Sequence, residues 1–265
     1  MLKLIAQNKY KLMVFIIGLH LLVDVWQHKG QARVLFPKKF EAYNTGAGLP
    51  QSKTVLINKN KEWKKGMNTK ELVNGLAETT SGFECDVYFD TVRSIFDVHH
   101  DADKSIGQSL DGLLDIYQQK KLSASIWLDL KNLDAANSTA ALRSLIQLRD
   151  KYGLQNKLLV ESGRAALLTA FSDSGFYTSY YTPMFNPYQA KDAEIRSMAE
   201  SISNVIKNAR VNALSGYYFQ YPFLHYYFPN YPVLTWAEKK PFSLVNYLFR
   251  RKIASDSAVF ISLYP

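Results

Sequence analysis

Two acidic side chains, two residues apart, carry the clearest chemistry in this sequence. Glu84 and Asp86 stand in a run of β-forming residues, 82–90, and alternate residues of a strand share one face. Two carboxylates on one face repel each other unless a cation or a basic partner lies between them. Because carboxylate oxygens are the ligands that Mg²⁺ and Ca²⁺ prefer, the pair indicates a hard-cation site, although a solvated strand can carry the same pattern.

A second strand-like run, 126–131, places an acid and a base on one face. Asp129 and Lys131 are again two residues apart, so both would project into the same pocket. With the first pair, Asp129 makes a set of three carboxylates that could ligate one divalent cation, with water and substrate oxygens completing its shell. Lys131 could stabilise charge on a phosphoryl group, and His99 or His100 could transfer a proton.

The elements that must position these residues alternate between strand-like and helix-like segments. This alternation predicts a (β/α)8 TIM barrel over residues 54–265, in which 82–101 forms one barrel position with an antiparallel extension. A doubly wound open sheet is the alternative, but no Gly-rich phosphate loop follows the first predicted strand. The predicted barrel strands are residues 54–58, 82–90, 123–131, 157–162, 176–182, 213–218, 232–238 and 258–264.

The carboxyl ends of barrel strands meet on one face, where side chains from different strands converge on a pocket. We expect Lys131 to contact the substrate together with Asn58, Glu161, Tyr217 and Trp236. The residues predicted on this face are Asn58, Glu84, Asp86, His99 or His100, Asp129, Lys131, Glu161, Tyr180 or Tyr181, Tyr217 and Trp236.

Composition and charge limit the function classes. The chain has 265 residues, of which 47% are hydrophobic, and a formal net charge of +9. That length and hydrophobic content suffice for one large α/β domain. Its basic residues are spread without an Arg-rich helix or zinc-ligand spacing, so anionic lipid or a phosphate-bearing ligand is favoured over nucleic acid. Cys85 is the only cysteine, which excludes an internal disulfide.

The N-terminal residues 1–28 predict a signal or membrane anchor. Three lysines, at positions 3, 9 and 11, precede the apolar run 12–23, but no small-x-small cleavage site follows the run. We therefore favour an uncleaved anchor with its basic end cytoplasmic and the barrel on the extracytoplasmic side. A cleaved signal of a secreted protein and a buried core helix are the alternatives. Residues 29–53 read as a linker packed on the barrel, and we expect 30–53 to fill part of the ring that a terminal helix would close.

Several short motifs follow one another along the chain. They are Glu84-Cys85-Asp86-Val87, His100-Asp101, Asp129-Leu130-Lys131, Trp236 and Ser262-Leu263-Tyr264-Pro265. Their order and spacing resemble the glycerophosphodiester phosphodiesterase-like superfamily, whose members are phospholipase C-like barrels. The Asp-x-Lys form of the third strand is closer to the sphingomyelinase D-like and menorin-like branches than to the bacterial glycerophosphodiesterases. The resemblance covers about residues 54–265.

This resemblance implies a Mg²⁺ or Ca²⁺ ion held by Glu84, Asp86 and Asp129, with Lys131 on the phosphate. It also implies two catalytic histidines, one at the end of the first strand and one in the loop after the second.

The second histidine is available as His100, which the His-Asp dipeptide favours, or as His99, which matches the usual spacing more closely. The first is missing, because Asn58 ends the first predicted strand and cannot accept and return a proton near neutral pH. Leu263 also departs from the motif, in which the family often has Asp.

Two functions follow. The first is a metal-dependent phosphodiesterase, a hydrolase or lyase acting on a glycerophosphodiester or phospholipid headgroup by acid–base catalysis. The second is a catalytically degenerate barrel that binds a phosphate-bearing or glycan ligand without turnover. The missing first histidine keeps both open, and the sequence carries no signal for an oligomeric state.

Overall fold

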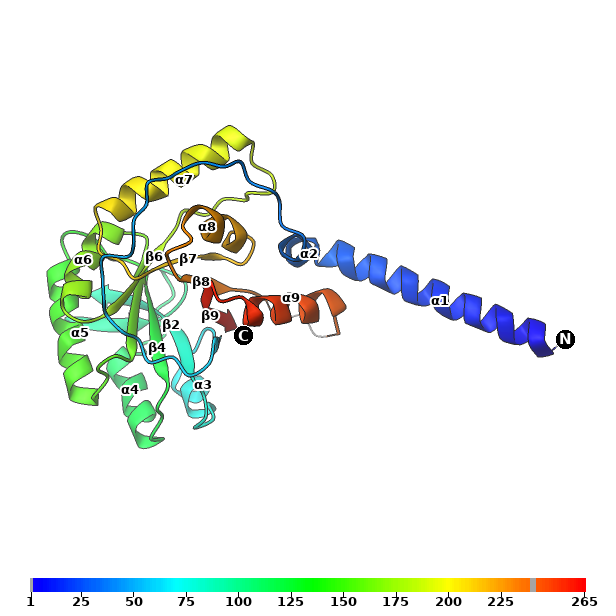
Figure 1. The fold of residues 1–265 in the computed structure, drawn as a ribbon. Helices are drawn as coiled ribbons and strands as arrows, with labels where there is room; N and C mark the ends of the chain where they lie inside the picture. The colour runs from blue at the N-terminus through cyan, green and yellow to red at the C-terminus, as the bar shows by residue number, and fades with distance from the viewer. Residues whose placement is uncertain (1, 239–241) are drawn as a thin grey trace.

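Within residues 2–238 and 242–265, which the computed structural model describes, eight parallel strands close into a barrel (Figure 1). Each strand pairs with the next around the ring, and the first pairs with both the second and the last. The (β/α)8 TIM barrel predicted from the sequence is therefore confirmed. The barrel strands are β1 (Glu62–Lys64), β2 (Gly82–Asp90), β4 (Ser125–Leu130), β5 (Leu158–Ser162), β6 (Tyr177–Tyr181), β7 (Ala213–Tyr217), β8 (Val233–Trp236) and β9 (Val259–Tyr264).

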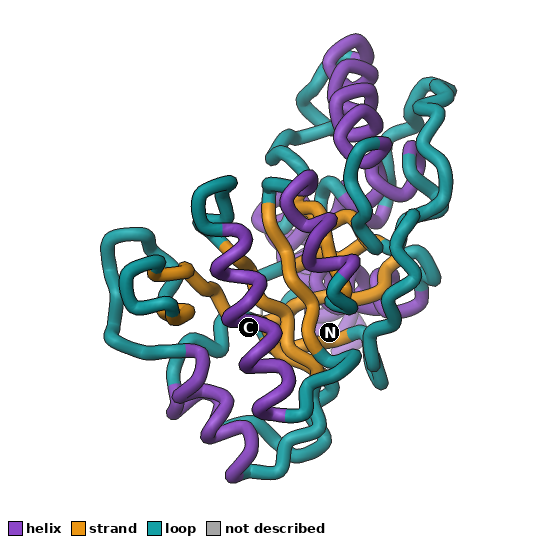
Figure 2. Tube along the Cα trace, turned by 90° about the vertical axis from the view of Figure 1, so that its left-hand side faces the viewer, coloured by secondary structure: helices purple, strands orange, loops and turns teal. Residues whose placement is uncertain are grey.

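Helices surround the strands, as Figure 2 shows in purple around orange. Hydroxyl side chains that precede α3, α4 and α9 accept a backbone N–H of the first turn, which is the usual stabilisation of a helix start. The short strand β3 (Ile95–Val98) pairs antiparallel with β2, as the antiparallel extension predicted. The helices are α3 (Lys70–Asn74), α4 (Leu110–Gln119), α5 (Ser138–Tyr152), α6 (Ala165–Asp173), α7 (Asp192–Lys207), α8 (Tyr221–Tyr227) and α9 (Leu244–Ser255).

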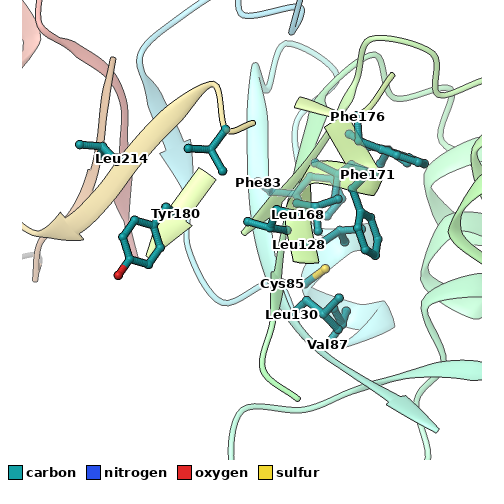
Figure 3. Packing of buried hydrophobic residues seen from close by; sticks show 14 of the residues in the cluster. Phe83, Cys85, Val87, Leu128, Leu130, Leu168, Phe171, Phe176, Tyr180 and Leu214 are labelled. Atoms are coloured by element: carbon teal, nitrogen blue, oxygen red, sulfur yellow. The ribbon is translucent and has the colours of Figure 1, made fainter. Parts of the chain in front are cut away.

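Alternate residues of each strand face outward and form the larger apolar core under the helices. In β2 these residues are Phe83, Cys85 and Val87, each at most 2% exposed. Figure 3 shows them beside Leu128 of β4 and Phe171 of α6. Because the helices cover this face, the other face of β2 is directed into the barrel.

The barrel interior has an apolar lower half, which includes Trp63, Trp127 and Leu159. Gly82 at the start of β2 allows this packing, since a Cβ atom there would lie 2.1 Å from the indole of Trp63. The polar residues of the barrel interior therefore lie on one side of this apolar layer.

The first barrel strand lies later in the sequence than predicted. Residues 54–58 form no strand and instead cross the amino-terminal end of the barrel, where Leu56 joins the apolar interior. The Asn58 amide donates to the carbonyl of Phe260 at 2.9 Å, and its oxygen accepts from the Trp63 indole at 3.1 Å. The prediction of a strand over 54–58 was wrong, because these residues close the lower end of the barrel.

The N-terminal helix α1 (Leu2–Gln27) projects away from the barrel (Figure 1). Its segment Lys9–Gln27 is long and apolar enough to cross a bilayer, and hardly any of it is buried. The base of α1 is fixed to the domain, because the buried Asp24 carboxylate accepts the backbone N–H of Val245 at 3.0 Å. The helix α2 (Lys29–Leu35) then turns back onto the domain.

The chain between α2 and β1 runs over α7 and α8. The Ser203 hydroxyl donates to the Thr45 carbonyl at 2.7 Å, and the Tyr227 hydroxyl donates to the Glu41 carbonyl at 3.0 Å. In Figure 1 this segment follows α7 and then descends along the barrel. These contacts place residues 41–45 over α7 and α8, and the expectation that residues 30–53 fill part of the ring that a terminal helix would close stays a prediction.

Candidate active site

Strand register brings the predicted acids together at the carboxyl end of the barrel. Asp86 of β2 is paired with Asp129 of β4, and Asp129 is paired with Glu161 of β5. Glu84 stands two residues earlier on the inner face of β2. Oxygens of Glu84, Asp86 and Asp129 all lie within 4.8 Å of one another, so the three carboxylates could hold one cation.

Lys131 lies within this acidic cluster. Its Nζ is 2.8 Å from Asp86 Oδ1, and it also donates to Asp129 Oδ2. Burial lowers the pKa of Lys131, but the charges of Asp129 and Asp86 reverse the effect and hold the pKa above its ordinary value. The side chain therefore stays cationic and is placed to meet an anionic group in the pocket.

The loop after β1 orients two of the carboxylates. The backbone N–H of Gly66 donates to Glu84 Oε2 at 2.7 Å. The Asn68 amide donates to Asp86 Oδ2 at 2.7 Å and accepts the Asp86 N–H at 2.9 Å. These bonds fix the carboxylates before any ligand arrives, which is how supporting interactions hold metal ligands in place.

The buried acids hold their protons more tightly than free carboxyl groups do. Burial raises the pKa of Glu84 to about 8, and Asp86 and Asp129 add to the effect. Burial also raises the pKa of Asp129, against the opposing effect of Lys131. Burial holds the pKa of Glu161 well above its usual range, and Asp129 raises it further.

These carboxylates fit a hard divalent cation. The donors are oxygens, which Mg²⁺ and Ca²⁺ prefer. Glu161 Oε2 is buried and has no hydrogen-bond partner among the residues that the structure describes, so the cluster offers a further acceptor beside the three close carboxylates.

The two neighbouring histidines have different surroundings. His100 lines the pocket, and its Nδ1 lies 2.8 Å from Asp101 Oδ1. His99 is buried, stacks on the Tyr88 ring at 4.3 Å and lies 3.8 Å from Asp97. Asp101 can orient the His100 ring, whereas His99 packs against β2 and β3 outside the pocket.

Aromatic side chains wall a cavity of about 140 Å³ above the acids. Trp236 lines it and makes an edge contact with Tyr181 at 5.3 Å. Tyr217, predicted to contact substrate, instead supports Trp236 from behind at 5.9 Å. The lining residues are Lys65, Glu84, Asp86, His100, Trp127, Asp129, Lys131, Glu161, Tyr181, Trp236 and Leu263.

The residue that follows the first strand is Lys65, which the sequence analysis missed. Its Nζ lies 5.9 Å from the Trp236 ring, at the mouth of the cavity. Asn58, expected in this place, lies at the opposite end of the barrel, because 54–58 is not the first strand. The strand β1 has only three residues, which is too short to show the alternation of apolar and polar residues that predicts a strand.

No family model and no curated protein sequence matches the chain. Solved structures do match it. A protein from Silicibacter pomeroyi assigned as a glycerophosphoryl diester phosphodiesterase is 15% identical with a TM-score of 0.53, over 82% of this chain and 91% of that one. One from Galdieria sulphuraria with a similar assignment is 14% identical with a TM-score of 0.53, over 80% and 94%.

A third such protein, from Agrobacterium tumefaciens, is 11% identical with a TM-score of 0.54, over 77% of this chain and 93% of that one. At these identities the likeness concerns the fold. The resemblance to the glycerophosphodiester phosphodiesterase-like superfamily is confirmed at that level. The sphingomyelinase D-like and menorin-like branches stay predictions.

Proposed function

We propose that this chain is a metal-dependent phosphodiesterase that cleaves a glycerophosphodiester or a phospholipid headgroup. The observation that carries the proposal is the cluster of Glu84, Asp86 and Asp129 at the carboxyl end of a TIM barrel, with Lys131 bonded to two of the three. A cluster that combines this negative charge with a fixed cation suits a ligand that brings a divalent ion and a phosphate together.

Three carboxylates, those of Glu84, Asp86 and Asp129, would hold Mg²⁺ or Ca²⁺, which polarises a phosphoryl oxygen when bound. Lys131 stabilises the negative charge that develops on the phosphoryl group. His100, oriented by its neighbouring carboxylate, gives a proton to the leaving oxygen.

Lys65 is proposed as a second cation on the phosphate. It follows the end of β1 and lines the same cavity as the acids and His100. A lysine here attracts the phosphate through its positive charge, and we assign it no role as a general base. The nucleophile is a water molecule or a hydroxyl group of the substrate, which forms a new P–O bond and loses its proton to solvent while the P–O bond to the leaving alcohol breaks.

The helix α1 is proposed to anchor the enzyme in a membrane, with the barrel on the extracytoplasmic side. Lys9 and Lys11 stand at the end of the apolar segment that is farther from the barrel. The positive-inside rule places this basic end in the cytoplasm. An anchored barrel would work beside the bilayer, which suits a phospholipid headgroup as substrate.

Release of alcohol or headgroup from a panel of phosphodiesters tests the proposal. The full chain in detergent is compared with His100→Ala, Lys65→His and His99→Ala in the presence of Mg²⁺ or Ca²⁺. We expect metal-dependent turnover that falls about 10²- to 10⁴-fold in His100→Ala, because general acid–base catalysis contributes about that much. Absence of turnover on every substrate, with phosphodiester binding retained, would contradict the proposal.

The binding-only alternative keeps one supporting observation. Among the residues that the structure describes, His100 is the one histidine that lines the pocket. If the barrel only binds its ligand, wild type and His100→Ala will both show no phosphodiester turnover, while Lys65→His will gain turnover. If the enzyme is active as it stands, Lys65→His will weaken phosphate binding, because imidazole is largely neutral at pH 7.

A further inference from the structure

The exposed face of α9 carries an apolar stripe that the barrel does not use. Leu244, Tyr247 and Leu248 are 48%, 55% and 42% exposed, and Arg251 continues the same face one turn later. Residues spaced by three and four share one face of a helix. The stripe is thus apolar towards the start of α9 and basic towards its end.

Phe242, just before this stripe, is 97% exposed. Its φ of +59° lies in the left-handed region, which a bulky side chain rarely adopts. This backbone conformation costs free energy, and exposing the aromatic ring to water does not offset that cost. The exposed position of the Phe242 ring suggests that the ring is buried against a surface that does not belong to this chain.

The start of α9 lies beside the base of α1, as Figure 1 shows. The Asp24 carboxylate accepts the Val245 N–H at 3.0 Å, and the Gln31 amide donates to Asn246 at 3.2 Å. These contacts hold the start of α9 against the domain end of α1 and against α2. A membrane surface at that end of α1 would therefore lie close to Phe242.

The length of α1 also brings the domain close to that surface. The apolar segment Lys9–Gln27 of α1 has 19 residues, which span about 28 Å at 1.5 Å per residue, close to the hydrocarbon core of about 30 Å. Trp26 is 75% exposed and stands at the domain end, where membrane helices favour aromatic residues. The buried Asp24 leaves no spacer between this point and the barrel.

We infer that Phe242 and the apolar stripe of α9 form a second membrane contact, which dips into the bilayer beside α1 and fixes the orientation of the barrel on the lipid. This inference rests on the membrane role proposed for α1. The exposed Arg251 would face anionic headgroups, which attract basic residues near a membrane surface. Apolar faces of interfacial helices enter bilayers by about 5–10 Å, so a helix held beside the membrane end of α1 can place its apolar stripe at that depth.

Depth-dependent quenching tests this contact in the full chain. Cys85 is fully buried, so a maleimide fluorophore will label an introduced surface cysteine selectively. The label is placed at Phe242→Cys or at Leu244→Cys, and the second variant keeps the phenyl ring. Gln147→Cys is the matched control, because this exposed residue belongs to α5, which lies on the opposite side of the barrel from α1. Ile16→Cys reports on α1 itself.

The labelled chains are reconstituted into vesicles of phosphatidylcholine and phosphatidylglycerol that contain a nitroxide acyl-chain lipid. We expect quenching at positions 242 and 244 to exceed that at 147 by about twofold or more, since an interfacial residue approaches the acyl chains. Equal quenching at all three, with position 16 strongly quenched, would overturn the contact and leave the anchor intact.

If position 16 is also unquenched, the anchor and the contact both fail, while the phosphodiesterase proposal is untouched. Labels at 242 and 244 that are shielded from an aqueous quencher but not quenched by lipid would indicate a second copy of the chain, which also contradicts the inference.

Discussion

The buried acids make the stability of the metal-free protein depend on pH, and Glu84 is one of the groups, with Asp129 and Glu161, whose raised pKa values cause this dependence. Its pKa is raised to about 8 by burial and by the neighbouring carboxylates, whereas in the unfolded chain it returns to about 4.3. Between these two values the folded protein keeps a proton that the unfolded chain has lost. The contribution of Glu84 to the free energy of unfolding therefore falls as pH rises through this window, and it is lost above about pH 8.

The size of the effect follows from the raised pKa. At 1.36 kcal/mol for each pKa unit, the loss between about pH 4.5 and 8 is on the order of 5 kcal/mol. For a domain of this size, that corresponds to a fall in Tm on the order of 10 °C. Glu84→Gln removes the titrating group, and its amide oxygen can still accept the Gly66 N–H.

Thermal unfolding in EDTA from pH 5 to 8.5 measures this dependence. We expect wild-type Tm to fall steeply over the range and that of Glu84→Gln to fall less, because Asp129 and Glu161 still titrate in the variant. Glu78→Gln, at an exposed glutamate, should follow the wild type. Parallel curves for wild type and Glu84→Gln would refute the reasoning, because the titration would then not belong to Glu84.

Three further predictions concern packing and metal binding. Gly82→Ala should destabilise the fold by about 1–3 kcal/mol in urea unfolding, because its Cβ would enter the Trp63 ring; unchanged stability would contradict the close approach. Leu56→Ala should cost about 2–4 kcal/mol in the same assay and Val55→Ala, at an exposed position, less than about 0.5 kcal/mol; equal costs would argue against closure of the barrel end by this segment. Mg²⁺ or Ca²⁺ should raise Tm in wild type but not in Asp129→Asn, as differential scanning fluorimetry would show; a variant that keeps the rise would remove this residue from the metal site.

The acidic cluster could be predicted because strand geometry alone places it. Glu84 and Asp86 share a face by alternation, and Asp129 joins them because parallel strands end at the same edge of a barrel. The apolar residues between them, such as Cys85, mark the opposite face as buried. No long-range information beyond strand order was needed.

The first strand could not be predicted from local pattern. Residues 54–58 are apolar and β-branched enough to resemble a strand, but they cover the barrel end, where only tertiary packing decides their role. The true strand has three residues, with Trp63 alone buried. Missing it also concealed Lys65, which lines the pocket only because β1 ends beside it.

Loop conformation decided the remaining positions. His99 and His100 follow the end of β3, so their directions depend on the turn and not on strand alternation. Tyr217 has the alternation of a pocket residue, but its ring packs edge-on against Trp236, and Trp236 lines the cavity in its place. Side chains at strand ends depend on neighbours from other strands, which sequence spacing does not reveal.

Turnover of a glycerophosphodiester in a metal titration tests the central claim most directly. The full chain and Asp129→Asn are assayed side by side for alcohol release, first in EDTA and then with increasing Mg²⁺ or Ca²⁺. The account predicts that wild-type activity is absent in EDTA and saturates with the metal, whereas the variant stays inactive. Activity that is unaffected by EDTA, or is equal in the two proteins, would contradict a phosphodiesterase that works through these three carboxylates.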